Sequence, residues 1–245
     1  MANHALLNNI EHKDLKVNTK RSAELGDNIW FSMTFPQEFR SAQSYYPIFF
    51  KKDVETGKFI CVTLFGFSEN ENLFLDDNGW NARYIPLSVL RHPFLIARQK
   101  VNVDGQEQEQ RMLTIDLDSP RVNKDEGHDL FLEFGGNSEY LERISAMMET
   151  LHFGALDGMA FCNRLVELNL LEPFTLDVTL NDHSRHQMLG FYTINEEKLN
   201  ELEVDVLKEL KDKGYLQAIY MQIASQGNVS GLLDKKNALV ASQAA

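Results

Sequence analysis

The sequence lacks an excess of basic residues, a secretory leader and any long hydrophobic run. It contains 24 Lys and Arg against 36 Asp and Glu, which gives a formal net charge of -12. Proteins that bind nucleic-acid backbones or anionic membranes need basic surfaces, so we expect neither kind of partner. The N-terminus has no basic segment followed by an apolar stretch, and no window reaches the roughly 18 apolar residues of a membrane span. We therefore expect no signal peptide and no membrane insertion.

Cysteine is also scarce. Cys61 lies in the run FICVTLF and Cys162 in MAFCNRL, and neither belongs to a CxxC pair. Two buried free thiols are the expected state, because isolated cysteines in apolar runs are usually core residues. Free thiols are typical of a reducing compartment, so the sequence predicts a cytoplasmic protein.

Catalytic and cofactor motifs are absent as well. No GxSxG, HExxH, CxxC or kinase-type set occurs, so no cofactor is predicted and an enzymatic role stays open. Hydrophobic residues make up 43% and charged residues 24%, which is typical of a globular protein. We expect a single domain over residues 1–235 and a frayed C-terminal tail over residues 236–245.

The apolar pattern predicts an α+β fold with a mostly antiparallel sheet. Turn residues at 53–57 and 181–185 separate pairs of β-branched and aromatic runs, which indicates two hairpins. Residues 130–134 (LFLEF) read as a further buried strand.

Helices are expected in the second half of the chain. A central helix pair is predicted after Ser138, with Gly154 separating its two members. The C-terminal region reads as a strand-strand-helix-strand-helix unit. Its first helix is capped by Asn195 and ended by Gly214, and its last strand covers residues 216–224.

Aromatic and arginine side chains gather in the stretch from Leu64 to Phe94, between proline and glycine residues that favour loops. Such side chains dominate binding hot spots, and loops commonly carry recognition residues. The binding candidates are Trp80, Arg83, Tyr84, Arg91 and Phe94. The alternative is that Trp80 and Phe94 are core residues and that the arginines pair with acidic loops.

A weaker alternative is a metal-dependent, oxygenase-like enzyme that acts on a peptide or small molecule. Asp116 and Asp118 lie two residues apart on one strand face, and His183 and His186 flank a turn. Carboxylates and imidazoles of this kind bind iron or zinc. The other interpretation is a solvated strand edge and an exposed polar turn.

Several pieces occur in an order and spacing that resemble the SapC family of bacterial proteins over roughly residues 10 to 233. They are Tyr46–Phe49, Leu64–Phe74, Trp80 with Tyr84–Pro86, Arg91–Phe94, Ile115–Asp116, Asp118–Pro120, Leu130–Phe131, Leu189–Phe191 before Glu196, and Gly214 with Tyr220 and Ser225. The family name comes from a bacterial surface-layer gene region, and members are often encoded near TonB-dependent receptors. The resemblance therefore implies a soluble accessory protein, without catalytic activity, that binds a protein or peptide of a surface-layer or envelope transport system.

Overall fold

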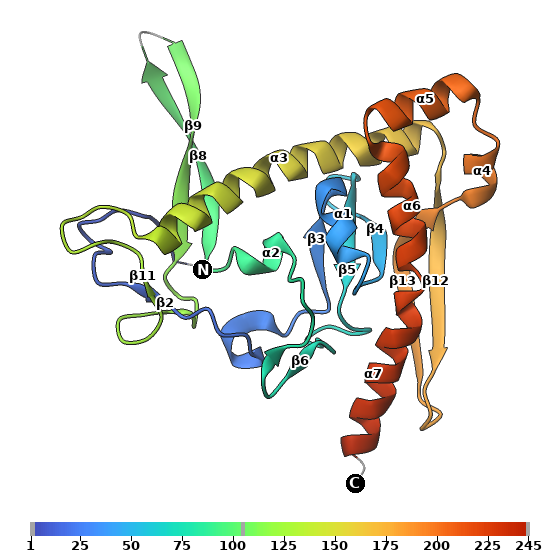
Figure 1. Ribbon diagram of the computed structural model, residues 1–245, viewed down its shortest axis with the longest axis horizontal. Coiled ribbons are helices and arrows are strands. Elements are labelled where there is room, and N and C mark those ends of the chain that lie inside the picture. Colours follow the sequence, from blue (N-terminus) through green and yellow to red (C-terminus); the bar gives the residue numbers. More distant parts are fainter. Residues whose placement is uncertain (1–2, 104–105, 244–245) are drawn as a thin grey trace. The chain divides into compact units, whose positions relative to one another are not determined.

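The computed structural model describes the backbone of residues 3–103 and 106–243, and their side chains except those of 99–109 and 186. Contacts divide the chain into two compact units, where the sequence suggested a single domain over residues 1–235. Unit 1 comprises Met1–Asp27 and Leu87–His152, and unit 2 comprises Asn28–Pro86 and Phe153–Ala245. The chain passes between the units at three positions, and the last of them, between His152 and Phe153, lies inside helix α3, which Figure 1 labels.

Unit 1 contains a long antiparallel hairpin, β8–β9, and a short third strand, β1, that pairs with β9. The order in this sheet is β1-β9-β8, and a smaller sheet has the order β10-β2-β11. The elements are β1 (His4–Leu6), β2 (Lys16–Val17), a helical turn at Ala23–Asp27, α2 (Leu87–Leu90), β8 (Phe94–Val103), β9 (Gln106–Asp116), β10 (Val122–Asn123), β11 (His128–Asp129) and the first half of α3 (Glu139–Glu167).

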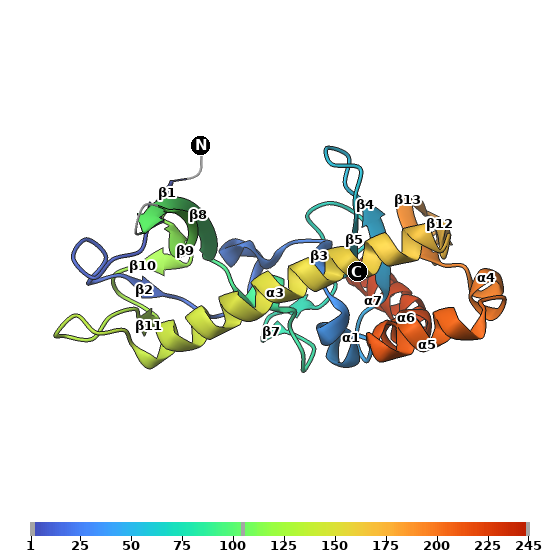
Figure 2. The same ribbon diagram turned by 90° about the horizontal axis from the view of Figure 1, so that it is seen from above.

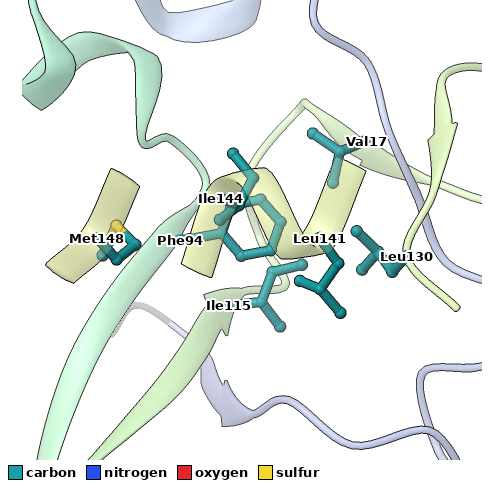
Figure 3. Close-up of a cluster of buried hydrophobic side chains, with 7 residues drawn as sticks. All are labelled: Val17, Phe94, Ile115, Leu130, Leu141, Ile144 and Met148. Carbon is teal, nitrogen blue, oxygen red and sulfur yellow. The ribbon is translucent and has the colours of Figure 1, made fainter. Parts of the chain in front are cut away.

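The core of unit 1 lies between this hairpin and α3. Side chains from the base of the hairpin meet one face of the helix, as the close-up shows (Figure 3). The buried members are Val17, Phe94, Ile115, Leu130, Leu141, Ile144 and Met148. Burial of this apolar area is the main source of stability for the unit.

Unit 2 contains a five-stranded antiparallel sheet with the order β12-β13-β4-β5-β3. Helix α6 lies alongside β13 and β4, and α5 packs against α6 (Figures 1 and 2). The elements are β3 (Phe31–Thr34), α1 (Pro36–Ala42), β4 (Ile48–Lys52), β5 (Phe59–Leu64), β6 (Leu75–Asp76), β7 (Gly79–Trp80), the second half of α3, β12 (Leu171–Thr179), β13 (Arg185–Ile194), α4 (Glu196–Asn200), α5 (Val204–Asp212), α6 (Tyr215–Ser225) and α7 (Asn228–Gln243).

The α+β class and both predicted hairpins are confirmed. The first hairpin is β4–β5 and the second is β12–β13. The Asn195 side chain accepts a hydrogen bond from the Lys198 N–H and caps α4, as predicted. The single helix predicted between Asn195 and Gly214 is wrong, because residues 201–203 are not helical and separate α4 from α5. Gly214 has φ 75° at the end of α5, a conformation that glycine adopts without steric cost.

The predicted central helix pair is wrong, because α3 is one helix of 29 residues that continues through Gly154. A Cβ atom at residue 154 would lie 2.4 Å from the Phe35 ring, and one at residue 158 would lie 3.4 Å from the Phe35 Cβ. Gly154 is therefore not a helix end. It lets the helix backbone approach Phe35 closely.

The strand predicted for residues 216–224 is also wrong, since these residues form α6. The buried positions are Tyr215, Ala218, Ile219, Gln222 and Ser225, which is a helical spacing. Two of their side chains bond the backbone of Ile48, beyond the residues Phe50 and Lys51 at which β4 pairs with β13. The Ile48 N–H donates to Ser225 Oγ at 2.9 Å, and Gln222 Nε2 donates to the Ile48 carbonyl at 2.8 Å.

The predicted strand at residues 130–134 is wrong as well. Leu130 is buried, but the following residues turn back on themselves and are mostly exposed. Residues 236–243, which the sequence analysis assigned to a C-terminal tail, belong to α7. Lys236 pairs there with Glu71, and both side chains are largely buried, which anchors the last helix to the loop after β5.

The two cysteines are buried and free, as predicted, and their Sγ atoms lie 3.5 Å apart between β5 and α3. Within the described ranges, none of the helices combines the length and the apolarity that crossing a membrane requires.

Candidate functional site

Two of the predicted binding residues belong to a hydrogen-bonded chain inside unit 2. Trp80 Nε1 donates to Tyr46 Oη at 2.8 Å, and Tyr46 Oη donates to the Tyr84 carbonyl. Trp80 also packs edge-on against Phe65, with ring centroids 5.0 Å apart. The side chains of Trp80 and Tyr84 are half-buried, so much of their polar and apolar surface already has partners within the fold.

The chain of hydrogen bonds ends on a buried carboxylate in the first turn of α1. Tyr84 Oη donates to Glu38 Oε1 at 2.5 Å, and Thr34 Oγ1 donates to Glu38 Oε2 at 3.1 Å. Burial, together with the nearby Glu38 carboxylate, raises the pKa of Tyr84, and burial raises that of Tyr46. Both phenols therefore stay protonated and act as donors. Arg83, by contrast, is exposed.

The other two predicted binding residues lie in unit 1. Arg91 Nη1 donates to the Phe94 carbonyl at 2.9 Å, and burial lowers the pKa of Arg91. Phe94 is fully buried in the core of unit 1. The five predicted residues thus fall into two sets: Trp80, Arg83 and Tyr84 in unit 2, and Arg91 and Phe94 in unit 1.

The candidate metal ligands are also divided between the two units: Asp116 and Asp118 belong to unit 1, and His183 and His186 to unit 2. Asp116 Oδ1 accepts the Asp118 N–H at 3.2 Å, and Asp118 Oδ2 accepts the Asn3 N–H at 3.1 Å, so both carboxylates stabilise a turn in unit 1. His183 lies in the β12–β13 turn of unit 2, and the side chain of His186 is outside the described part. The described residues contain no group of three or more His, Cys, Asp or Glu that could hold a metal ion.

A tight turn at residues 132–135 exposes large apolar side chains in unit 1. The Gly135 N–H donates to the Leu132 carbonyl at 2.9 Å, which closes the turn, and the Leu132 N–H donates to Gly136 at 2.7 Å. Gly135 has φ +87°, a conformation that glycine adopts without steric cost. The two central residues of the turn, Glu133 and Phe134, are therefore directed outward, and Phe134 is 95% exposed.

A second loop adjoins this turn. Asn9 Nδ2 donates to the Gly135 carbonyl at 2.6 Å, which joins the loop after β1 to the turn before α3. Ile10, the next residue, is 86% exposed, and Leu132 is 56% exposed. We call Ile10, Leu132 and Phe134 the Phe134 ridge. These three large apolar side chains are exposed on two loops that a hydrogen bond joins, and exposed apolar surface is a feature of interaction sites.

A pocket of about 680 Å³ opens beside the ridge and includes Leu132 in its wall. His128 and Tyr140 stack in the same wall, with ring centroids 4.8 Å apart and planes at 16°. Burial raises the pKa of Tyr140 to about 12, so the phenol is neutral at physiological pH. Ser138 Oγ accepts the Leu141 N–H at 3.1 Å and donates to the Asp129 carbonyl, which fixes the start of α3 at the pocket.

The pocket wall has balanced charge. Its charged residues are Lys13, Lys16, Lys124, Arg143, Asp14, Asp129, Glu133 and Glu139. Aromatic and aliphatic surface next to charges of both signs suits a polypeptide, which itself presents apolar side chains, amides and charged groups.

Sequence reasoning missed this surface because a run such as LFLEF is normally a buried strand. The signal that could have revealed the turn is Gly135-Gly136 directly after the run, since paired glycines favour turns over strand continuation. No sequence signal indicates that Phe134 is exposed.

The SapC family model matches residues 7–232, which is nearly the whole chain. The chain belongs to the SapC family. The SapC match spans both units, and it includes the Phe134 ridge and the whole pocket wall. No curated protein and no solved structure matches the chain.

Proposed function

We propose that this SapC-family chain is an accessory protein without catalytic activity that binds a protein or peptide of a bacterial surface-layer or envelope transport system. The observation that carries the proposal is the Phe134 ridge. A phenylalanine that is 95% exposed loses the free energy that its burial would provide, and a partner that covers it recovers that free energy.

The pocket beside the ridge supports the same proposal. Rim charges around an apolar centre are the usual anatomy of a protein interface. Membership in the SapC family supports the envelope setting, because the family name comes from a surface-layer gene region.

The test is comparative capture from an envelope extract of cells that express the protein. The baits are the wild-type chain, Phe134→Ser and Val54→Ser, a control in which an equally exposed apolar residue of unit 2 is changed. We expect an envelope component to be retained by the wild type and Val54→Ser and to be lost with Phe134→Ser. Identical sets of captured proteins for all three baits would contradict the proposal.

A further inference from the structure

Cys61 and Cys162 are the two cysteines of the chain, and the fold of unit 2 brings their side chains into contact. Their Sγ atoms lie 3.5 Å apart, although the residues are 101 positions apart in the sequence. Cys61 is 2% exposed and Cys162 is 0% exposed. Both are free thiols, so the structure shows a reduced pair whose sulfur atoms meet inside the core.

The backbone on both sides of this contact is firmly held. Cys61 lies in β5, which pairs with β3 along one edge and with β4 along the other. Cys162 lies in α3 directly after Phe161, and the Phe161 ring packs against the rings of Phe39 and Tyr215. The two sulfur atoms therefore stay close together while unit 2 is folded.

A disulfide requires only a small adjustment of this geometry. Its S–S bond is about 2.05 Å long, so closing the separation of 3.5 Å takes a movement of less than about 1 Å by each sulfur. Because both thiols are buried, a thiol of a second chain does not reach them in the folded state. The fold thus favours closure within one chain.

We propose that Cys61 and Cys162 are a redox-responsive pair, in which a peroxide converts the two thiols into a disulfide that links β5 to α3. This inference does not depend on the proposed function. In the first step one thiol attacks hydrogen peroxide, its sulfur becomes a sulfenic acid and one water leaves. In the second step the other thiol attacks that sulfur, the S–S bond forms and a second water leaves. The two thiols together lose two electrons, and one peroxide is reduced to two waters.

Burial makes this closure slow. Burial raises the pKa of Cys61, so the thiolate that reacts with peroxide is scarce, and peroxide reaches the pair when unit 2 opens locally. The pair therefore responds to prolonged oxidation. Once formed, the bond joins residues 101 positions apart, which restricts the unfolded chain and so stabilises the folded one.

The first experiment detects the bond in the full-length protein. Reduced protein, freed of reductant, is incubated with hydrogen peroxide for several hours, treated with catalase, unfolded in iodoacetamide and digested without reduction. We expect two peptides joined through Cys61 and Cys162, with no iodoacetamide label on either residue. Reduction of the unfolded protein with dithiothreitol before labelling is expected to restore both labels, and protein without peroxide treatment is expected to carry both.

The second experiment measures the stabilisation. Peroxide treatment is expected to raise the Tm of the wild type by at least about 5 °C, since a cross-link that closes a long loop stabilises strongly. Cys61→Ser and Cys162→Ser are the matched controls. Each removes one sulfur of the pair and keeps all eight methionines, so the controls report any effect of methionine oxidation. Peroxide is expected to leave their Tm unchanged or lower, and the peptide measurement on the wild type needs neither variant.

The other outcomes overturn the inference. Two labelled cysteines after peroxide treatment mean that the thiols do not close. Sulfinic or sulfonic acid at either residue, without the joined peptides, means that one thiol is oxidised further before its neighbour reacts. Joined peptides from a species of twice the mass place the bond between two chains, and a disulfide that lowers the Tm contradicts stabilisation. None of these results bears on the Phe134 ridge, whose test remains the capture experiment.

Discussion

Arg121 Nη2 donates to Asp27 Oδ2 at 2.6 Å, and the two side chains are 1% and 3% exposed. Arg121 Nη1 also donates to the carbonyls of Asn18 and Lys20, at 3.1 and 2.8 Å. One buried guanidinium thus holds the segment before the Asp27 turn against the loop that follows β9. Within unit 1, this contact replaces the regular strand pairing that the segment lacks.

Arg121→Ala is expected to lower the free energy of unfolding by about 3 kcal/mol or more, because it leaves a buried carboxylate and two carbonyls without this donor. Lys20→Ala is the control, since Lys20 and Glu126 form an exposed pair at 3.8 Å. Its cost is expected to stay under about 1 kcal/mol. Chemical denaturation measures both values, and equal effects would contradict the structural role of Arg121.

Because α3 approaches Phe35 closely, replacing glycine by alanine is expected to change stability in opposite directions at Gly154 and at Gly231. Replacing glycine by alanine inside a helix normally stabilises it by about 1 kcal/mol. Gly154→Ala is expected to destabilise by about 1–3 kcal/mol instead, because the new Cβ meets the Phe35 ring at 2.4 Å. Gly231→Ala in α7, where nothing lies within 4 Å, is expected to stabilise. Two thermal melts check both signs, and stabilisation by both changes would rule out the contact.

The role of Gly154 also shows where sequence reasoning reaches its limit. The hairpins were predictable because local signals specify them: turn residues lie between two β-branched runs. The continuity of α3 through Gly154 was not predictable, because the residue that needs a glycine there, Phe35, lies far away in the sequence. A glycine that ends a helix and a glycine that admits an aromatic ring look alike until the fold is known.

Two other errors arose from ambiguous periodicity. The segment 216–224 was predicted as a strand, since Ile219, Met221 and Ile223 alternate with other residues, but the burial of Ala218, Gln222 and Ser225 in α6 follows a helical spacing. Short apolar segments satisfy both patterns, and tertiary contacts decide between them. The Phe134 turn is a harder case, since hydrophobicity predicts burial and only the structure shows the exposed side chain.

The cysteine pair gives a prediction about reactivity. Burial raises the pKa of Cys61, so the reactive thiolate is scarce in the native state. We expect native protein to react slowly with iodoacetamide and denatured, non-reduced protein to incorporate two labels. Mass spectrometry counts the labels. Denatured protein with no labels and a mass lower by two hydrogens would indicate a disulfide instead.

The predicted stretch from Leu64 to Phe94 needs a test that separates packing from binding. Trp80 donates to Tyr46 and packs on Phe65, so Trp80→Ala removes a hydrogen bond and leaves a cavity. We expect it to lower the free energy of unfolding by about 2–3 kcal/mol, below the cost for a fully buried tryptophan. Arg83 is exposed, and Arg83→Ala is expected to change stability by less than about 0.5 kcal/mol.

Arg83→Ala is therefore the variant that tests binding by this stretch without disturbing the fold. If the stretch contacts a partner, this variant melts like the wild type and captures less of the partner, because arginine contacts at interfaces are often energetically important. Trp80→Ala, in contrast, loses partner and stability together, so its binding defect alone proves nothing. Parallel melts and capture assays on both variants, beside Phe134→Ser, show which surface the partner uses. A partner that Arg83→Ala retains fully and Phe134→Ser loses assigns recognition to unit 1, and leaves Trp80 and Tyr84 as core residues of unit 2.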